Sequence, residues 1–120
     1  MNNEFISVTL VTPVHNEGES IYSTVEEFFK YYNDSHIKVN FIISEDGSKD
    51  NSVEQIRLLQ KKYPIKLISE PIRKGYSKAV IDGLKMVKTD VVSFIDSDGQ
   101  CDPADLEFLL IEFNKNNLVI

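Results

Sequence analysis

Two carboxylates separated by one small residue form the most informative group in this sequence. Asp96 and Asp98 flank Ser97 and directly follow the apolar run 91–95. Such a run is typical of a buried strand, and open parallel sheets bind ligands just beyond the carboxyl ends of their strands. Neighbouring carboxylates repel each other, and Mg²⁺ or Mn²⁺ takes oxygen ligands that it often shares with substrate phosphates. The pair therefore indicates a divalent-cation site, while an ordinary solvated turn is the alternative interpretation.

The composition is that of one acidic globular domain. The 120 residues are 42% hydrophobic and 27% charged, which is ordinary for a soluble protein. A net charge of −6 without a basic stripe argues against nucleic-acid binding. Cys101 is the only cysteine, so no internal disulfide can form and a reducing compartment fits. The first residues lack the features of a signal peptide, and no run approaches the ~20 apolar residues of a membrane span.

The elements that must position the acid pair alternate along the chain. Strands are predicted at 5–11, 39–43, 65–68 and 91–95, and 118–120 resembles the start of a fifth. A helix is predicted from Pro103, with Asp102 as its N-cap. Repeated βα units predict an α/β fold: a doubly wound, mostly parallel sheet with helices on both faces. The expected core faces of the four helices are Ile21, Val25, Phe28, Phe29 and Tyr32; Val53, Ile56, Leu59 and Tyr63; Val80, Leu84 and Val87; and Leu106, Leu109, Leu110 and Phe113.

Polar side chains follow each of the four predicted strands, in segments 12–17, 44–48, 70–75 and 96–100. A doubly wound sheet brings the carboxyl ends of its strands to one rim. We therefore expect these four segments to form one site around the acid pair.

Together these segments resemble a known family. The set V-T-P-V-H-N-E, S-E-D-G-S, R-K-G-Y-S-K-A-V-I-D-G and D-S-D-G-Q-C-D-P is similar to the family 2 glycosyltransferases with the GT-A fold. The resemblance is closest to the branch of dolichyl- and polyprenyl-phosphate sugar transferases, where Gln and Pro follow the metal motif as Gln100 and Pro103 do here. It implies that residues 1–120 are the Rossmann-like, N-terminal nucleotide-sugar-binding part of a longer GT-A domain.

The resemblance also implies roles for individual residues. Asp46 matches an acid that accepts a hydrogen bond from a base N–H, and Ser44 matches a residue whose backbone borders the base. Glu45 departs from the more usual Asp of that motif. Arg73 and Lys74 match a basic loop near the donor, and His15 is expected in the pocket wall. The residues implied to bind the donor are Pro13, Val14, Glu17, Ser44, Asp46, Arg73, Asp96 and Ser97.

For the metal and the chemistry, the resemblance implies three residues. Asp96 matches an acid near the ribose and the metal, and Asp98 matches the ligand that ties the cation to the diphosphate. Gln100 matches a further ligand of the metal site. Asp96 and Asp98 are thus the implied catalytic residues, with Mg²⁺ or Mn²⁺ as the cofactor.

The implied reaction is inverting transfer of a hexose from a nucleoside diphosphate sugar, with a UDP-sugar as the first expectation and a GDP-sugar as the second. A polyprenyl phosphate or a growing glycan would accept the sugar, at the cytoplasmic face of a membrane. Residues 1–120 alone are expected to be inactive.

Other classes fit the sequence less well. A phosphatase or a receiver domain would carry its acid pair after the first strand, where Pro13-Val14-His15 stands. A dinucleotide-binding domain would need a glycine series that the sequence lacks. The main alternative is a nucleotide-sugar-binding or interaction module without turnover.

Overall fold

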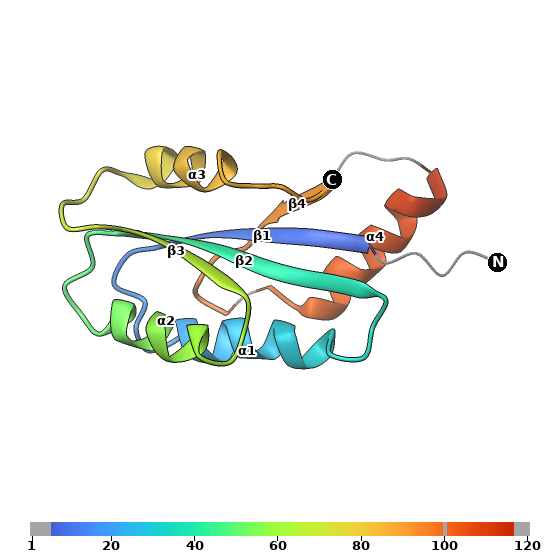
Figure 1. The fold of residues 1–120 in the computed structure, drawn as a ribbon, viewed down its shortest axis with the longest axis horizontal. Helices are drawn as coiled ribbons and strands as arrows, with labels where there is room; N and C mark the ends of the chain where they lie inside the picture. The colour runs from blue at the N-terminus through green and yellow to red at the C-terminus, as the bar shows by residue number, and fades with distance from the viewer. Residues whose placement is uncertain (1–5, 100, 117–120) are drawn as a thin grey trace.

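The protein is seen in a computed structural model that describes residues 6–99 and 101–116. Its centre is a four-stranded sheet made of β1 (Ile6–Val14), β2 (Ile37–Asp46), β3 (Ile65–Glu70) and β4 (Val91–Phe94). The strand order is β3-β2-β1-β4, and all three pairings are parallel (Figure 1). The predicted parallel sheet is confirmed. The expected strand at 118–120 lies outside the described residues.

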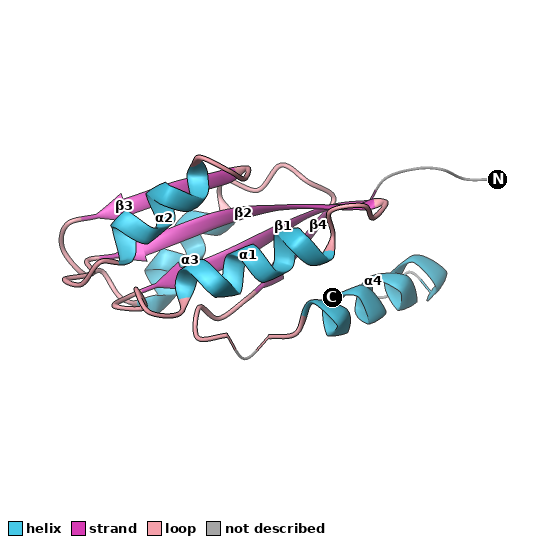
Figure 2. Ribbon diagram, turned by 90° about the horizontal axis from the view of Figure 1, so that it is seen from below, coloured by secondary structure: helices cyan, strands magenta, loops and turns pink. Residues whose placement is uncertain are grey.

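Helices cover both faces of this sheet, as a doubly wound fold requires (Figures 1 and 2). On one face lie α1 (Ile21–Tyr31) and α2 (Ser52–Gln60); on the other lies α3 (Tyr76–Leu84), which packs against β1 and β2. The last helix, α4 (Pro103–Asn116), contacts α1. It begins as predicted, because Asp102 Oδ1 accepts a hydrogen bond from the Ala104 N–H at 2.8 Å.

The main core lies between the sheet and α1, α2 and α4. Side chains of β1 alternate between the two faces of the sheet, so Val8, Leu10 and Val14 join this core while Val11 faces α3. The aromatic residues predicted on α1 are buried here, and Phe29 stacks on Tyr63 with ring centroids 4.4 Å apart. These contacts hold α1 and α2 against the strands whose ends form the rim.

Two predicted core faces are corrected by the structure. In α3 the buried residues are Ala79 and Gly83, whereas Leu84 is exposed and Val87 lies beyond the helix end. The α3 backbone lies close to the sheet at Gly83, which explains why α3 turns its small residues toward the sheet. A Cβ on Gly83 would lie 2.7 Å from Val11 Cγ1, so only a small residue fits there. In α4, Leu109 is exposed.

Helix geometry explains which residues of α4 face the core. Leu106 and Leu110 are buried and stand four residues apart, which places them on one face of the helix. Leu109 falls beside that face and is 49% exposed. The side chain of Phe113 lies outside the described part of the structure.

Candidate active site

The strand registers bring the predicted rim segments together. Pro13 pairs with Ser44, Asp46 with Glu70, and Val11 with Phe94, so all four strands end at the same edge of the sheet. A pocket of about 310 Å³ opens at this edge. It is lined by Pro13, Val14, His15, Glu17, Asp46, Arg73, Tyr76, Ala79, Asp96, Ser97 and Asp98.

This one pocket is lined by most of the residues that were predicted to bind the donor. Their functional roles stay predictions. Ser44 is an exception, because it is fully buried and does not line the pocket. Its hydroxyl has no hydrogen-bond partner among the described residues. Gln100 lies outside the described residues. Tyr76 and Ala79 also line the pocket but were not predicted from the sequence, although both belong to the R-K-G-Y-S-K-A segment that carried the family resemblance.

Asp46 is the most constrained acid of the pocket. Its side chain is 4% exposed. Its Oδ1 accepts the Lys74 backbone N–H at 2.6 Å, and its Oδ2 accepts the Gly75 backbone N–H at 2.9 Å. The exposed Arg73 side chain brings Nε to 4.0 Å from Oδ2. An ionised carboxylate has about four acceptor positions, so Asp46 keeps capacity for a ligand N–H while it holds the loop.

His15 is joined to the same strand end. Its Nδ1 lies 2.6 Å from the Asp46 carbonyl oxygen, and its Nε2 lies 3.2 Å from the Asn16 side-chain nitrogen. A carbonyl oxygen only accepts, so Nδ1 carries the proton and Nε2 accepts. His15 therefore forms part of the pocket wall, as expected.

The two basic residues of the predicted donor loop have different surroundings. Arg73 lines the pocket, with 62% of its side chain exposed. Lys74 is only 16% exposed, and its Nζ lies 2.5 Å from Asp82 Oδ2 and 3.5 Å from Glu70 Oε1. Among the described lining residues Arg73 is the one cation beside four acids. Of the two basic residues of this loop, Arg73 lines the pocket and Lys74 does not.

Hydrogen bonds join the loops that follow β1, β2 and β4. Asn16 N–H donates to Ser48 Oγ at 3.0 Å, and Glu17 N–H donates to Ser52 Oγ at 2.9 Å. Ser20 Oγ donates to the Ser97 carbonyl oxygen at 2.7 Å, which ties the residue between the two acids to the start of α1. Three separate loops are therefore held as one wall.

Glu45, the residue that departs from the family motif, supports the rim from inside. It is buried, accepts a hydrogen bond from the Ser48 backbone N–H, and accepts another from Ser69 Oγ at 2.7 Å. It does not line the pocket. Glu45 therefore stabilises both the turn after β2 and the pairing of β2 with β3.

The acid pair fits a hard divalent cation that a ligand helps to hold. Asp96 and Asp98 are exposed and line the same pocket. Within residues 6–99 and 101–116 no group of three or more Asp, Glu, His or Cys side chains could hold a metal ion alone. Mg²⁺ commonly uses one or two carboxylates plus substrate phosphates and waters, so two carboxylates suit a cation that arrives with a diphosphate.

Cys101 lies next to these acids and is no candidate nucleophile. Partial burial and the negative charges of Asp96, Asp105 and Asp98 raise the pKa of its thiol. The thiol therefore stays protonated at neutral pH.

Gly47 lets the turn after β2 pack against the donor loop. Its φ is +62°, and a Cβ there would lie 2.6 Å from the Arg73 backbone nitrogen. We expect Gly47→Ala to lower the free energy of unfolding by about 1–2 kcal/mol from the left-handed backbone alone, and by more because the loop must move. Chemical denaturation measures the free energy of unfolding of the variant and of the unmodified protein. The matched control is Gly99→Ala, which shares a positive φ but meets only the Thr24 side chain at 3.4 Å. Equal losses in the two variants would contradict the close-packing argument.

The parallel sheet and its rim pocket define the class of this protein. It is a doubly wound α/β protein whose candidate site lies beyond the carboxyl ends of the strands. Residues 9–120 match the family described as glycosyl transferase family 2, and the chain belongs to that family.

Two relatives show the range of enzymes that this chain resembles. The dolichol-phosphate mannosyltransferase of Pyrococcus furiosus is 34% identical over 113 residues, covering 92% of this chain and 31% of that enzyme. The poly-beta-1,6-N-acetyl-D-glucosamine synthase of Staphylococcus epidermidis is 28% identical, covering 92% and 26%. The chain thus spans about a third or less of the length of these relatives.

Solved structures share the GT-A fold. S. aureus TarS 1–349 in complex with UDP superposes with a TM-score of 0.76 at 18% identity, covering 93% of this chain and 33% of that one. The mannosyltransferase PcManGT from Pyrobaculum calidifontis, in complex with GDP-Man and Mn²⁺, has a TM-score of 0.63 at 23% identity, covering 76% and 27%. The predicted fold class is confirmed. In the described residues, no helix combines the length and apolarity needed to cross a membrane.

Proposed function

We propose that this protein contributes the donor-binding part of an inverting glycosyltransferase, which transfers a hexose from a nucleoside diphosphate sugar. The observation that carries the proposal is the single pocket that contains Asp46 from the end of β2 together with Asp96 and Asp98 from the end of β4. A base-reading acid and a metal-binding pair in one pocket suit the two ends of a nucleoside diphosphate. Residues 1–120 alone bind donor weakly and transfer poorly under this proposal.

The nucleoside lies against the residues at the ends of β1 and β2. Pro13 and Val14 supply an apolar wall, and Glu17 closes it from the start of the following loop. Asp46 accepts a base N–H with the acceptor positions that the loop amides leave open. A UDP-sugar is the first candidate and a GDP-sugar the second. The UDP complex of TarS and the GDP-Man complex of PcManGT support these two bases as alternatives.

Asp96 and Asp98, with Gln100 beyond the described residues, would hold Mg²⁺ or Mn²⁺. When bound, such a cation supplies Lewis-acid stabilisation of the charge that develops on the departing diphosphate. Ser97 keeps the two acids in place, because its carbonyl oxygen accepts the Ser20 hydroxyl. Arg73 adds positive charge beside the acids, at the side of the pocket that Asp46 borders.

A panel of nucleotides tests the proposal. Isothermal calorimetry of the chain as its gene encodes it, with UDP, GDP and CDP and with or without Mn²⁺, should show metal-dependent binding of one uridine or guanosine nucleotide. Binding of no nucleotide under either condition would contradict the proposal. Binding with no sugar transfer to any acceptor would favour a nucleotide-sugar-binding module instead.

The acceptor is expected to be a polyprenyl phosphate at the cytoplasmic face of a membrane. The reasons are Gln100 and Pro103 after the acid pair and the similarity to the dolichol-phosphate mannosyltransferase. A phosphate acceptor is already ionised, so the rate should stay nearly flat from about pH 7 upward, because the second phosphate ionisation falls near 6. Radiolabelled donor offered to membranes should give label in the organic-extractable lipid.

In a parallel experiment, the same radiolabelled donor is offered to soluble glycans as the acceptor. Similarity to the poly-beta-1,6-N-acetyl-D-glucosamine synthase makes a growing glycan the alternative. Label found only in glycan would contradict the lipid acceptor and leave the glycosyltransferase proposal intact.

A further inference from the structure

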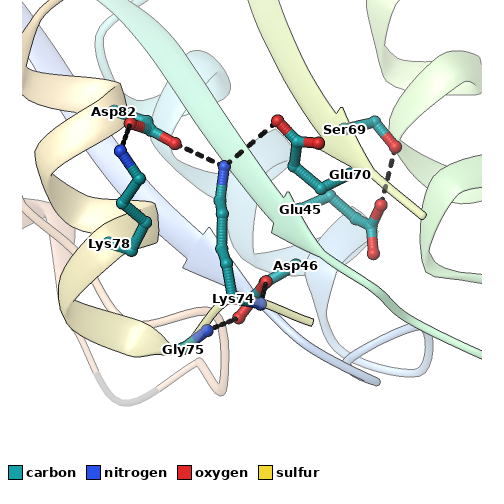
Figure 3. A network of polar contacts seen from close by, with 8 residues as sticks. All are labelled: Glu45, Asp46, Ser69, Glu70, Lys74, Gly75, Lys78 and Asp82. Atoms are coloured by element: carbon teal, nitrogen blue, oxygen red, sulfur yellow. Dashed lines mark hydrogen bonds and ion pairs between the residues drawn. The ribbon is translucent and has the colours of Figure 1, made fainter. Parts of the chain in front are cut away.

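The loop of residues 73–75, between β3 and α3, is held from two sides. On the pocket side the Asp46 carboxylate accepts the backbone N–H groups of Lys74 and Gly75. On the opposite side the Lys74 ammonium lies between Glu70 and Asp82 (Figure 3). The two attachments use the backbone and the side chain of the same residue.

The Lys74 ammonium joins two elements. Glu70 is the last residue of β3, and Asp82 lies near the end of α3. The Lys74 side chain is 16% exposed and that of Asp82 is 20% exposed, so this pair is less screened by solvent than a surface ion pair. Burial opposes the charge on Lys74, but the hydrogen bond and the negative charge of Asp82, together with Glu70, hold its pKa above the ordinary value.

Removing this ammonium would leave negative charge without its compensating cation. Glu70 and Asp82 would lose the cation that lies between them. Lys78 would still pair with Asp82 Oδ1 at 3.3 Å, but no ion pair between Lys78 and Glu70 is seen in the described residues. The backbone of the 73–75 loop would keep its hydrogen bonds to Asp46, the bond from the Ala79 N–H to the Gly75 carbonyl oxygen and the close approach of Gly47, but it would lose the anchor on its other side.

We propose that Lys74 is a positioning residue for donor binding: its ammonium holds the 73–75 loop in the conformation in which Asp46 and Arg73 line the pocket. This inference rests on the proposed function. It gives Lys74 a role different from that of a cation that touches the donor, because Lys74 is absent from the pocket lining and its ammonium is engaged by two carboxylates.

The test is Lys74→Met in the chain as its gene encodes it. Methionine keeps the unbranched shape and removes the charge. We expect the KM for the donor and the Kd of its nucleotide to rise about tenfold, the scale of a lost charged hydrogen bond, while kcat stays within about twofold because Asp96 and Asp98 do not move. A merely structural loss would instead reduce the active fraction, which lowers kcat and leaves KM unchanged. That result would overturn the proposal.

Lys78→Met is the matched control. Lys78 pairs with the same Asp82, is 55% exposed and does not line the pocket, so its removal should leave KM and Kd unchanged. An equal rise in both variants would assign the effect to Asp82 and the charge of α3, and would overturn the role of Lys74.

A second measurement needs no donor. Hydrogen exchange of a peptide that covers residues 73–76 should speed up in Lys74→Met and stay unchanged in Lys78→Met, because the loop loses the side-chain anchor that holds the Lys74 and Gly75 amides against Asp46. If the unmodified protein binds no nucleotide, the proposed function fails, yet this exchange comparison still decides whether Lys74 holds the 73–75 loop. Unchanged exchange in Lys74→Met would overturn it.

Discussion

Asp98→Ala is expected to abolish metal-dependent donor binding and to leave the fold intact. Asp98 is exposed at the end of β4, and removal of one acid from a repulsive pair should cost little stability. Loss of a hydrogen-bonded neighbour of a metal ligand commonly lowers metal affinity 10- to 100-fold. Loss of a ligand itself should therefore weaken nucleotide binding in Mn²⁺ by about 100-fold or more. Binding without Mn²⁺ should stay at the unmodified level.

Calorimetry with and without Mn²⁺ measures this effect, and thermal unfolding followed by circular dichroism checks the fold. Asp90→Ala is a suitable control, because Asp90 is an exposed acid at the opposite end of β4. An Asp98→Ala protein that unfolds, or that binds the nucleotide normally in Mn²⁺, would remove Asp98 from the metal site. If Asp90→Ala weakened binding as strongly, net charge would be the cause.

Asp46→Ala should weaken nucleotide binding by about 1–3 kcal/mol, the value of a hydrogen bond to a charged group, and should blur the choice among bases. The structure gives this variant a second effect. The Lys74 and Gly75 amides would lose their acceptor, so the 73–75 loop would also loosen. The weaker affinity therefore combines a lost base contact with a displaced loop.

Competition among uridine, guanosine and cytidine diphosphates separates the two effects. A displaced loop lowers all three affinities together, as expected for Lys74→Met, whereas a lost base contact changes their order. Ser44→Ala is the control on the same strand, because the Ser44 hydroxyl is buried and lies outside the pocket lining. An unchanged order at unchanged affinity in Asp46→Ala would exclude Asp46 from base recognition.

Much of this fold could be predicted from the sequence because the relevant signals are local. Short apolar runs mark strands, apolar residues spaced three or four apart mark helices, and Asp102 with Pro103 marks the start of α4. The βα order then requires parallel strands whose carboxyl ends share one rim. The sequence by itself thus determined the α/β class, the family resemblance and the grouping of Asp46, Asp96 and Asp98 in one pocket.

Tertiary structure alone decided which predicted residues face that pocket and what holds them. Ser44 is buried and Lys74 points to Asp82, although each belongs to a segment that reaches the rim. Gly83 faces the sheet because the α3 backbone approaches Val11 closely, a contact between residues 72 positions apart in the chain. The physical reason is that side-chain partners are set by packing and hydrogen bonding between distant segments, whereas residue spacing reports only which face of its own element a side chain occupies.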